Sequence, residues 1–135
     1  MASIRAALVL VLFLASCGTD STRTLSVSAG AAIWSEFETE AQVESVLPFM
    51  GEHGLVLNRS VTLGETDFDR LEKLIRTAQR HGVTVRLWPE LKEEEGRWPS
   101  VGTRALFIPF FYELMDFVES RKLPVDTLYV DLEPS

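Results

Sequence analysis

The alternation of short apolar runs with segments of helical period is the feature that most restricts the fold of this chain. Two of the helical segments have apolar residues three and four positions apart. The first carries Val43, Val46, Leu47 and Met50, and the second carries Phe68, Leu71, Leu74, Ile75 and Ala78. This spacing predicts one buried face of an amphipathic helix. Apolar runs flank both segments, so the pattern predicts strands that are joined through helices.

Four apolar runs and three helices follow one another in the order β-α-β-α-β-α-β. The runs are residues 31–34, 55–57, 83–88 and 125–131. The third helical segment carries Phe110, Phe111, Leu114, Phe117 and Val118. Strands that are connected through helices lie parallel in a sheet that the helices cover. The sequence therefore predicts an α/β fold with a parallel sheet.

Capping and helix-breaking residues predict where the helices begin and end. Asp67 is a suitable N-cap for the second helix. Pro48 is expected to shorten the first helix, which Gly51 and Gly54 would end. Pro109 is expected to begin the third helix, because proline is favoured in the first helical position.

Two architectures fit a parallel sheet of this kind, an open doubly wound sheet and the first half of an eight-stranded barrel. No glycine-rich phosphate loop follows residues 31–34, where Glu36 and Glu38 would repel a phosphate. This favours the N-terminal half, about four strands, of a (β/α)8 TIM barrel over residues 31–135. Because the sequence ends on a strand, we expect it to be the N-terminal half of a longer product or a degenerate remnant of one. Open sheet edges in such a half would invite self-association.

Residues at the C-terminal ends of the predicted strands are the candidate binding residues, because ligands meet α/β sheets at this end. They are Trp34, Ser35 and Glu36 after the first run, Asn58 and Arg59 after the second, Trp88, Pro89 and Glu90 after the third, and Tyr129, Asp131 and Glu133 on the fourth. Trp98 lies in a connection that is long enough to be a lid or binding loop. Indole rings beside carboxylate, carboxamide and guanidinium groups suit a carbohydrate ligand. Packing in the core and rim is the alternative for Trp34 and Trp88.

The last strand carries two acidic residues in a D-x-E arrangement. Side chains alternate along a strand, so Leu128, Val130 and Leu132 are expected to face the helices, and Tyr129, Asp131 and Glu133 the opposite side. Alternate Cα atoms are about 6–7 Å apart, so one of the two carboxyl groups would hold a proton, as a glycosidic general acid must. We expect the strand to lie centrally in the sheet and to point both acids into a hollow shared with the indoles. Two solvated acids are the alternative.

The segment DTLYVDLEP at residues 126–134 resembles the fourth-strand signature D-x-x-D-x-D-x-E of the family 18 chitinases, which fold as eight-stranded barrels. Asp126, Asp131 and Glu133 match, and Tyr129 stands where that family has an aspartate. The resemblance implies that Glu133 is a general acid and that Asp131 orients the acetamido group of the substrate. Lysozyme-like barrels of the family 25 type also carry D-x-E on a strand and remain an alternative.

The N-terminus is typical of an export signal. Residues 1–5 carry a positive charge, and the apolar run of residues 6–15 is too short to span a bilayer. Residues 14–18, LASCG, resemble the processing box of bacterial lipoproteins, which implies removal of residues 1–16 and lipidation of Cys17. An ordinary cleaved signal is the alternative. Residues 18–30 are rich in Ser, Thr and Gly and are expected to form a flexible tether after the lipidated Cys17.

Charge and histidine spacing restrict the partners. Removal of residues 1–16 leaves 12 basic and 20 acidic side chains, so nucleic acid is an unfavourable partner. Consecutive acids at residues 93–95 would diverge, and neither His53 nor His81 has a second histidine at ligand spacing, so we expect no metal site and no cofactor.

Together these features predict a lipid-anchored lipoprotein of the bacterial cell envelope. Its domain would be glycoside hydrolase-like, incomplete or weakly active, and a membrane would be its partner through the anchor. The alternative is a non-catalytic envelope lipoprotein that binds glycan or has a structural role.

Overall fold

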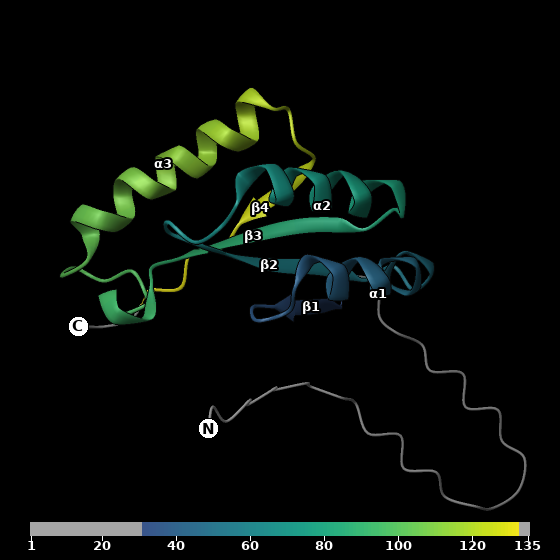
Figure 1. Cartoon of the computed structure of the whole chain (residues 1–135), viewed down its shortest axis with the longest axis horizontal. Helices are drawn as coiled ribbons and strands as arrows, with labels where there is room; N and C mark the ends of the chain where they lie inside the picture. Colours follow the sequence, from purple (N-terminus) through teal and green to yellow (C-terminus); the bar gives the residue numbers. More distant parts are fainter. Residues whose placement is uncertain (1–30, 133–135) are drawn as a thin grey trace, which may run out of the picture.

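Strands and helices alternate along the chain in the predicted order. The computed structural model describes residues 31–132, whereas the predicted signal peptide, Cys17 with its tether, and Glu133 lie outside the described residues. The elements are β1 (Ala32–Ser35), α1 (Glu40–Glu52), β2 (Val56–Thr62), α2 (Phe68–Arg80), β3 (Thr84–Glu90), the one-turn 3-10 helix η1 (Glu93–Glu95), α3 (Arg104–Ser120) and β4 (Val125–Leu128). Figure 1 shows the helices alternating with the strands of one sheet.

The four strands form one parallel sheet in the order β1-β2-β3-β4. The predicted α/β class with a parallel sheet is thus confirmed. Crossovers between parallel strands are right-handed, so adding each new strand on the same side places all the helices on one face of the sheet. The strand order does not reverse within residues 31–132, and this arrangement is compatible with half of a barrel.

The predicted central position of the last strand is wrong. β4 lies at the edge of the sheet, because β3 is the only strand that it pairs with among the described residues. β1 forms the opposite edge.

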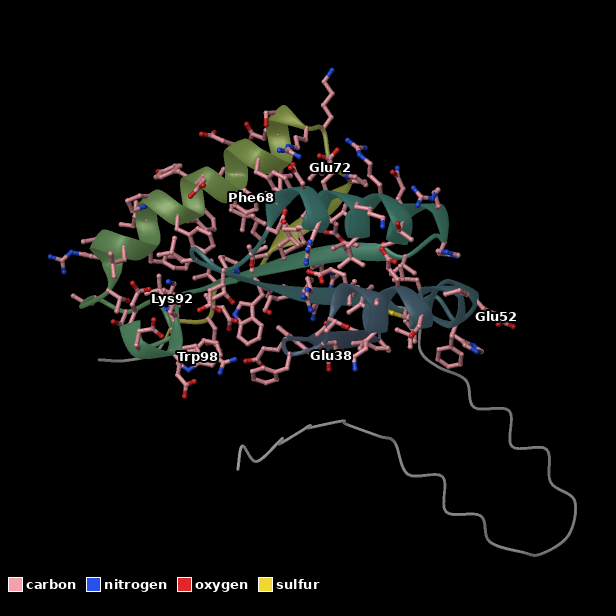
Figure 2. The ribbon with its side chains drawn as sticks, viewed as in Figure 1. Glu38, Glu52, Phe68, Glu72, Lys92 and Trp98 are labelled. Carbon is pink, nitrogen blue, oxygen red and sulfur yellow. The ribbon has the colours of Figure 1, made fainter. Side chains whose placement is uncertain are left out.

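A single hydrophobic core lies between the helices and one face of the sheet. Leu57 and Val61 of β2 and Val85 and Leu87 of β3 share this face. All three α-helices contribute to the same cluster, through Val43, Leu47 and Met50 of α1, Leu71, Leu74, Ile75 and Ala78 of α2, and Phe110, Leu114 and Phe117 of α3. Phe68 of α2, which is labelled in Figure 2, points toward α3. It stacks on Phe117 with 4.5 Å between ring centroids, and this contact joins α2 to α3. The other face of the sheet therefore carries no helix within residues 31–132.

Asp67 is the N-cap of α2, as predicted. Its side chain is a hydrogen-bond acceptor for the backbone N–H groups of Asp69 and Arg70, at 2.9 and 3.1 Å. These bonds satisfy two of the donors that a helix leaves unpaired at its N-terminus.

The prediction that Pro109 begins the third helix is wrong. α3 begins at Arg104, so Pro109 lies inside the helix, and α1 continues past Pro48 to Glu52. A buried residue lies in the affected turn of each helix, Phe107 in α3 and Leu47 in α1. This burial offsets the backbone hydrogen bond that each proline removes. Gly51 is likewise inside α1 and does not end it.

The lengths of β2 and β4 also differ from the prediction. β2 continues to Thr62, because it pairs with β3 over its whole length, from Val56 opposite Thr84 to Thr62 opposite Glu90. β4 ends at Leu128, so strand alternation no longer applies beyond it. Leu128 packs against the core as expected, but Val130 and Leu132 are exposed and do not face the helices.

Candidate functional site

A pocket of about 480 Å³ lies on the helix-free face of the sheet, at the C-terminal ends of the strands. We call it the aromatic pocket, and it is lined by Trp34, Glu36, Trp88, Tyr129, Val130 and Asp131. Trp34 and Trp88 face the same side because Trp34 is in register with Asn58, and Trp88 with Ser60 two residues further along β2. Parallel pairing thus brings together residues that are almost 100 positions apart in the sequence.

Three tryptophans and a tyrosine form a continuous aromatic cluster beside this pocket. The Trp34 ring meets the edge of Trp88 at a centroid distance of 5.2 Å and an interplanar angle of 86°. Tyr129 lies 5.7 Å from Trp34 on its other side. Trp98 stacks on Trp88 at 5.0 Å and 15°. Trp88 is buried by these neighbours, whereas Trp34 remains 52% exposed and offers an open ring face.

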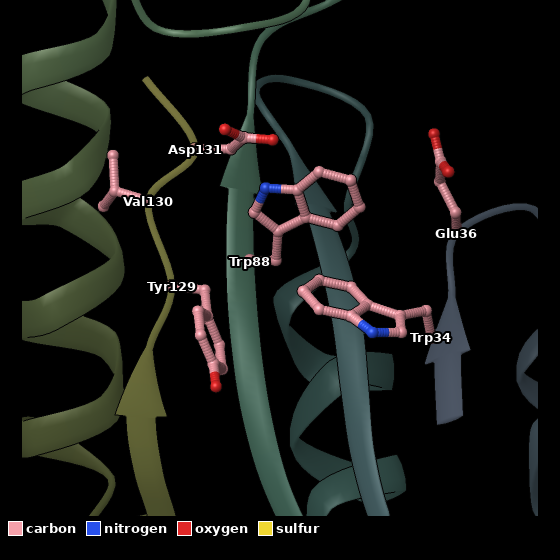
Figure 3. Close-up of a pocket in the computed structure, with 6 residues that line it drawn as sticks. All are labelled: Trp34, Glu36, Trp88, Tyr129, Val130 and Asp131. Atoms are coloured by element: carbon pink, nitrogen blue, oxygen red, sulfur yellow. The ribbon is translucent and has the colours of Figure 1, made fainter. Parts of the chain in front are cut away.

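The indole N–H of Trp88 is buried and has no hydrogen-bond partner among the described residues. Its nitrogen is turned toward the side of the pocket where Asp131 lies (Figure 3). A buried donor without an acceptor is costly and uncommon in folded proteins. The pocket therefore offers a donor to an oxygen atom of a ligand.

Two carboxylates reach the pocket from separate strands. Glu36 follows β1 and Asp131 follows β4, and they lie on opposite sides of the two indoles (Figure 3). Glu36 forms an ion pair with Arg97, whereas Asp131 has no ion-pair partner within residues 31–132.

Arg97 connects the site to the end of β3. Its Nε lies 3.3 Å from a carboxylate oxygen of Glu90, so one guanidinium serves both Glu36 and Glu90. The guanidinium also lies 5.2 Å from the Phe37 ring centroid and 5.1 Å from that of Trp98. It thereby holds the connection after β3 against the strand ends, with Trp98 stacked on Trp88.

Glu90 is an almost fully buried acid. Only 5% of its side chain is exposed, and the Thr62 hydroxyl donates a 3.0 Å hydrogen bond to it. Burial raises the pKa of Glu90, and the hydrogen bond from Thr62 acts in the opposite direction.

The structure brings most, but not all, of the predicted site residues together. Trp34, Glu36, Trp88, Tyr129 and Asp131 line the pocket, and Trp98 supports it from behind Trp88. The predicted catalytic partner Glu133 lies outside the described residues.

The placement of Asn58 and Arg59 at a strand end is wrong, because β2 continues to Thr62. Asn58 is buried in the middle of β2, and its side-chain oxygen has no partner among the described residues. Arg59 is on the helix side of the sheet, where it donates hydrogen bonds to Ser35 Oγ and the Glu38 carbonyl at 2.8 and 2.9 Å. Neither residue lines the aromatic pocket.

Sequence reasoning did not identify Arg97, Thr62 or Val130 as part of this region. The exposure of Val130 follows from the early end of β4, and the true end of β2 would have indicated Thr62. Arg97 lies in a long connection, and no local pattern there predicts its two carboxylate partners.

No group of three metal-ligating side chains comes together within the part of the chain that the structure describes. In that same part, no helix has the length and apolar character needed to cross a membrane.

Comparisons of the chain with protein-family models, with curated proteins and with solved structures found no match.

Proposed function

We propose that this protein is an exported, lipid-anchored lipoprotein of the bacterial cell envelope. Its domain would have a glycoside hydrolase-like fold with four strands of a TIM barrel, and it would bind a glycan in the aromatic pocket. The unbroken strand order and the placement of all three helices on one face support the barrel over a doubly wound sheet.

One observation carries the glycan proposal: the exposed Trp34 ring packs against Trp88, whose buried N–H has no acceptor within residues 31–132 and is turned toward Asp131. A sugar presents an apolar C–H face that can stack on an indole. A sugar hydroxyl can also accept a hydrogen bond from Trp88 and donate one to the Asp131 carboxylate. A sugar can therefore stack on the indole of Trp34, accept a hydrogen bond from Trp88 and donate one to Asp131.

Substitution of Trp34 tests this proposal directly. We expect Trp34→Ala to weaken the binding of glycan oligomers by about tenfold, because removing a stacking indole costs on the order of 1–2 kcal/mol. Isothermal titration of the full chain with chitin and peptidoglycan oligomers measures the effect.

Tyr112→Ala is the matched control, because Tyr112 is an exposed aromatic residue on α3, outside the pocket. Both variants should keep the far-ultraviolet circular dichroism of the parent. Equal glycan affinity of Trp34→Ala and the parent would contradict the proposed site.

The catalytic part of the proposal assigns the general acid to Glu133 and a substrate-orienting role to Asp131. The alternative is a non-catalytic envelope lipoprotein, which the exposed Trp34 platform supports equally well, since binding needs no acid. Release of new reducing ends from a bound glycan, and its loss in Glu133→Gln, separates the hydrolase from the binding protein.

The anchor is tested at Cys17. We expect Cys17→Ala to remain without acyl chains, because the cysteine thiol and its new amino group are the proposed attachment points. Intact mass spectrometry of the membrane fraction should show the acyl mass on the parent alone. The same added mass on both chains would contradict the assignment.

Within residues 31–132, the outer edges of β1 and β4 pair with no further strand. These edges are the surfaces through which copies of the chain would associate, because an open edge has unpaired backbone donors and acceptors.

A further inference from the structure

We infer that the aromatic pocket selects glycans that carry a protonated amino group over neutral or N-acylated ones. The inference rests on the proposed glycan function, and it concerns the chemical class of the sugar. Two observations support it: the charges around the pocket, and the buried indole N–H of Trp88.

The region around the pocket has an excess of negative charge among the described residues. Glu36 and Asp131 line the pocket, and Glu90 lies behind it on the end of β3. Arg97 is the only described cation that pairs with any of these three carboxylates, and it divides its guanidinium between Glu36 and Glu90.

The next cation on this face is already engaged. Arg86 pairs with Asp126 at 3.5 Å, and it donates to the Tyr129 hydroxyl at 3.4 Å. It therefore brings no net positive charge to the pocket, and the Asp131 carboxylate has no cation paired with it within residues 31–132. A cationic ligand would balance that charge.

The exposed face of Trp34 favours the same ligand charge. An ammonium group over an indole ring is attracted by the negative face of the ring. Trp34 and Asp131 both line the pocket, on either side of the Trp88 indole (Figure 3). An ammonium in the pocket would be attracted by the Trp34 ring, and one beside Asp131 would form a charge-assisted hydrogen bond.

A cation alone does not account for the pocket, because the buried Trp88 N–H needs an acceptor. A metal ion or a simple aliphatic amine has no oxygen for it, and a neutral sugar leaves Asp131 without a counter-charge. An amino sugar carries an ammonium donor next to hydroxyl oxygens, so it can serve both groups. N-acetylation removes the positive charge and would therefore remove the preference.

Paired ligands of equal length test the inference on the full chain. Glucosamine oligomers should bind about tenfold more tightly than N-acetylglucosamine oligomers, because a charge-assisted hydrogen bond is about twice as strong as a neutral one. The preference should shrink as salt is added, since screening weakens exposed charge pairs. Asp131→Asn should abolish the preference, and Asp116→Asn, an exposed aspartate on α3, should retain it.

Each result has a separate meaning. Equal or tighter binding of the N-acetylated oligomers, or a preference that Asp131→Asn leaves unchanged, would overturn the inference while the glycan site stands. Failure of every oligomer to bind, neutral glucose oligomers included, would overturn the proposed function itself.

Discussion

Gly51→Ala is expected to lower the free energy of unfolding by about 2 kcal/mol, although alanine is the better helix former. Gly51 lies in the last turn of α1, where this helix meets the C-terminal cap of α2. A Cβ atom at this position would be 1.9 Å from the carbonyl oxygen of His81. Because that oxygen belongs to the backbone, the two helices would have to separate. Overpacking of this kind typically costs 1–3 kcal/mol.

Chemical unfolding followed by circular dichroism measures this effect, and the melting temperature should fall by roughly 10 °C. Gly102→Ala is the matched control, since its added Cβ would meet only Ser100 Oγ at 3.6 Å, an ordinary contact. We expect that control to change the unfolding free energy by less than about 0.5 kcal/mol. Equal stability of Gly51→Ala and the parent would show that α1 and α2 do not approach as closely as described.

Arg97→Met should lower the unfolding free energy by about 2 kcal/mol at neutral pH. The substitution removes the cation that forms an ion pair with Glu90, and the Glu90 side chain is only 5% exposed. Removing one partner of a buried ion pair is strongly destabilising, because the remaining charge is uncompensated. The hydrogen bond from Thr62 remains and limits the loss.

The effect should depend on pH in a defined direction. Burial raises the pKa of Glu90 above its ordinary value of 4.5, and the loss of Arg97 should raise it further. The folded state then disfavours the ionised form of Glu90, so Arg97→Met loses stability at neutral pH. This loss disappears as the pH falls through the raised pKa of the folded state and below the ordinary value, where Glu90 is protonated in both the folded and the unfolded state. The deficit of Arg97→Met should therefore shrink on acidification.

A second substitution isolates the charge. Glu90→Gln in the Arg97→Met background should recover about 1 kcal/mol at neutral pH, because no buried charge is left unpaired. Arg70→Met is the control, since the Arg70–Asp67 pair is exposed, and we expect a loss of less than about 0.5 kcal/mol. A deficit of Arg97→Met that stays the same at all pH values would assign the effect to packing and not to Glu90.

Local features of the chain determined the order of elements and much of the core. Apolar residues three and four positions apart fixed the buried faces of α1 and α2, and Asp67 fixed the start of α2. Val46 is the exception, because it was predicted on the buried face of α1 and is exposed. These predictions held because neighbours along a helix or strand interact directly, whatever surrounds them. The tryptophans at the strand ends were also identified this way, since parallel strands present their C-terminal ends at one edge.

Helix and strand ends that depend on burial were not determined locally. Pro48 and Pro109 are inside helices because buried residues hold the turns around them. The full length of β2 follows from its pairing with β3 along seven residues, and this moved Asn58 and Arg59 away from the strand end.

The sequence by itself determined an α/β chain of parallel strands with indoles and acids near the strand ends. Only the tertiary structure decided which of these residues meet. Trp34 packs against Trp88 and Tyr129, and Arg97 lies between Glu36 and Glu90. Asp131 lies on the side of the indole N–H of Trp88, which has no partner within residues 31–132. The physical reason is that these contacts join residues far apart in the chain. They form only when the strands pair in the observed register and the connection after β3 packs against the strand ends. Neither condition produces a periodic pattern in the sequence.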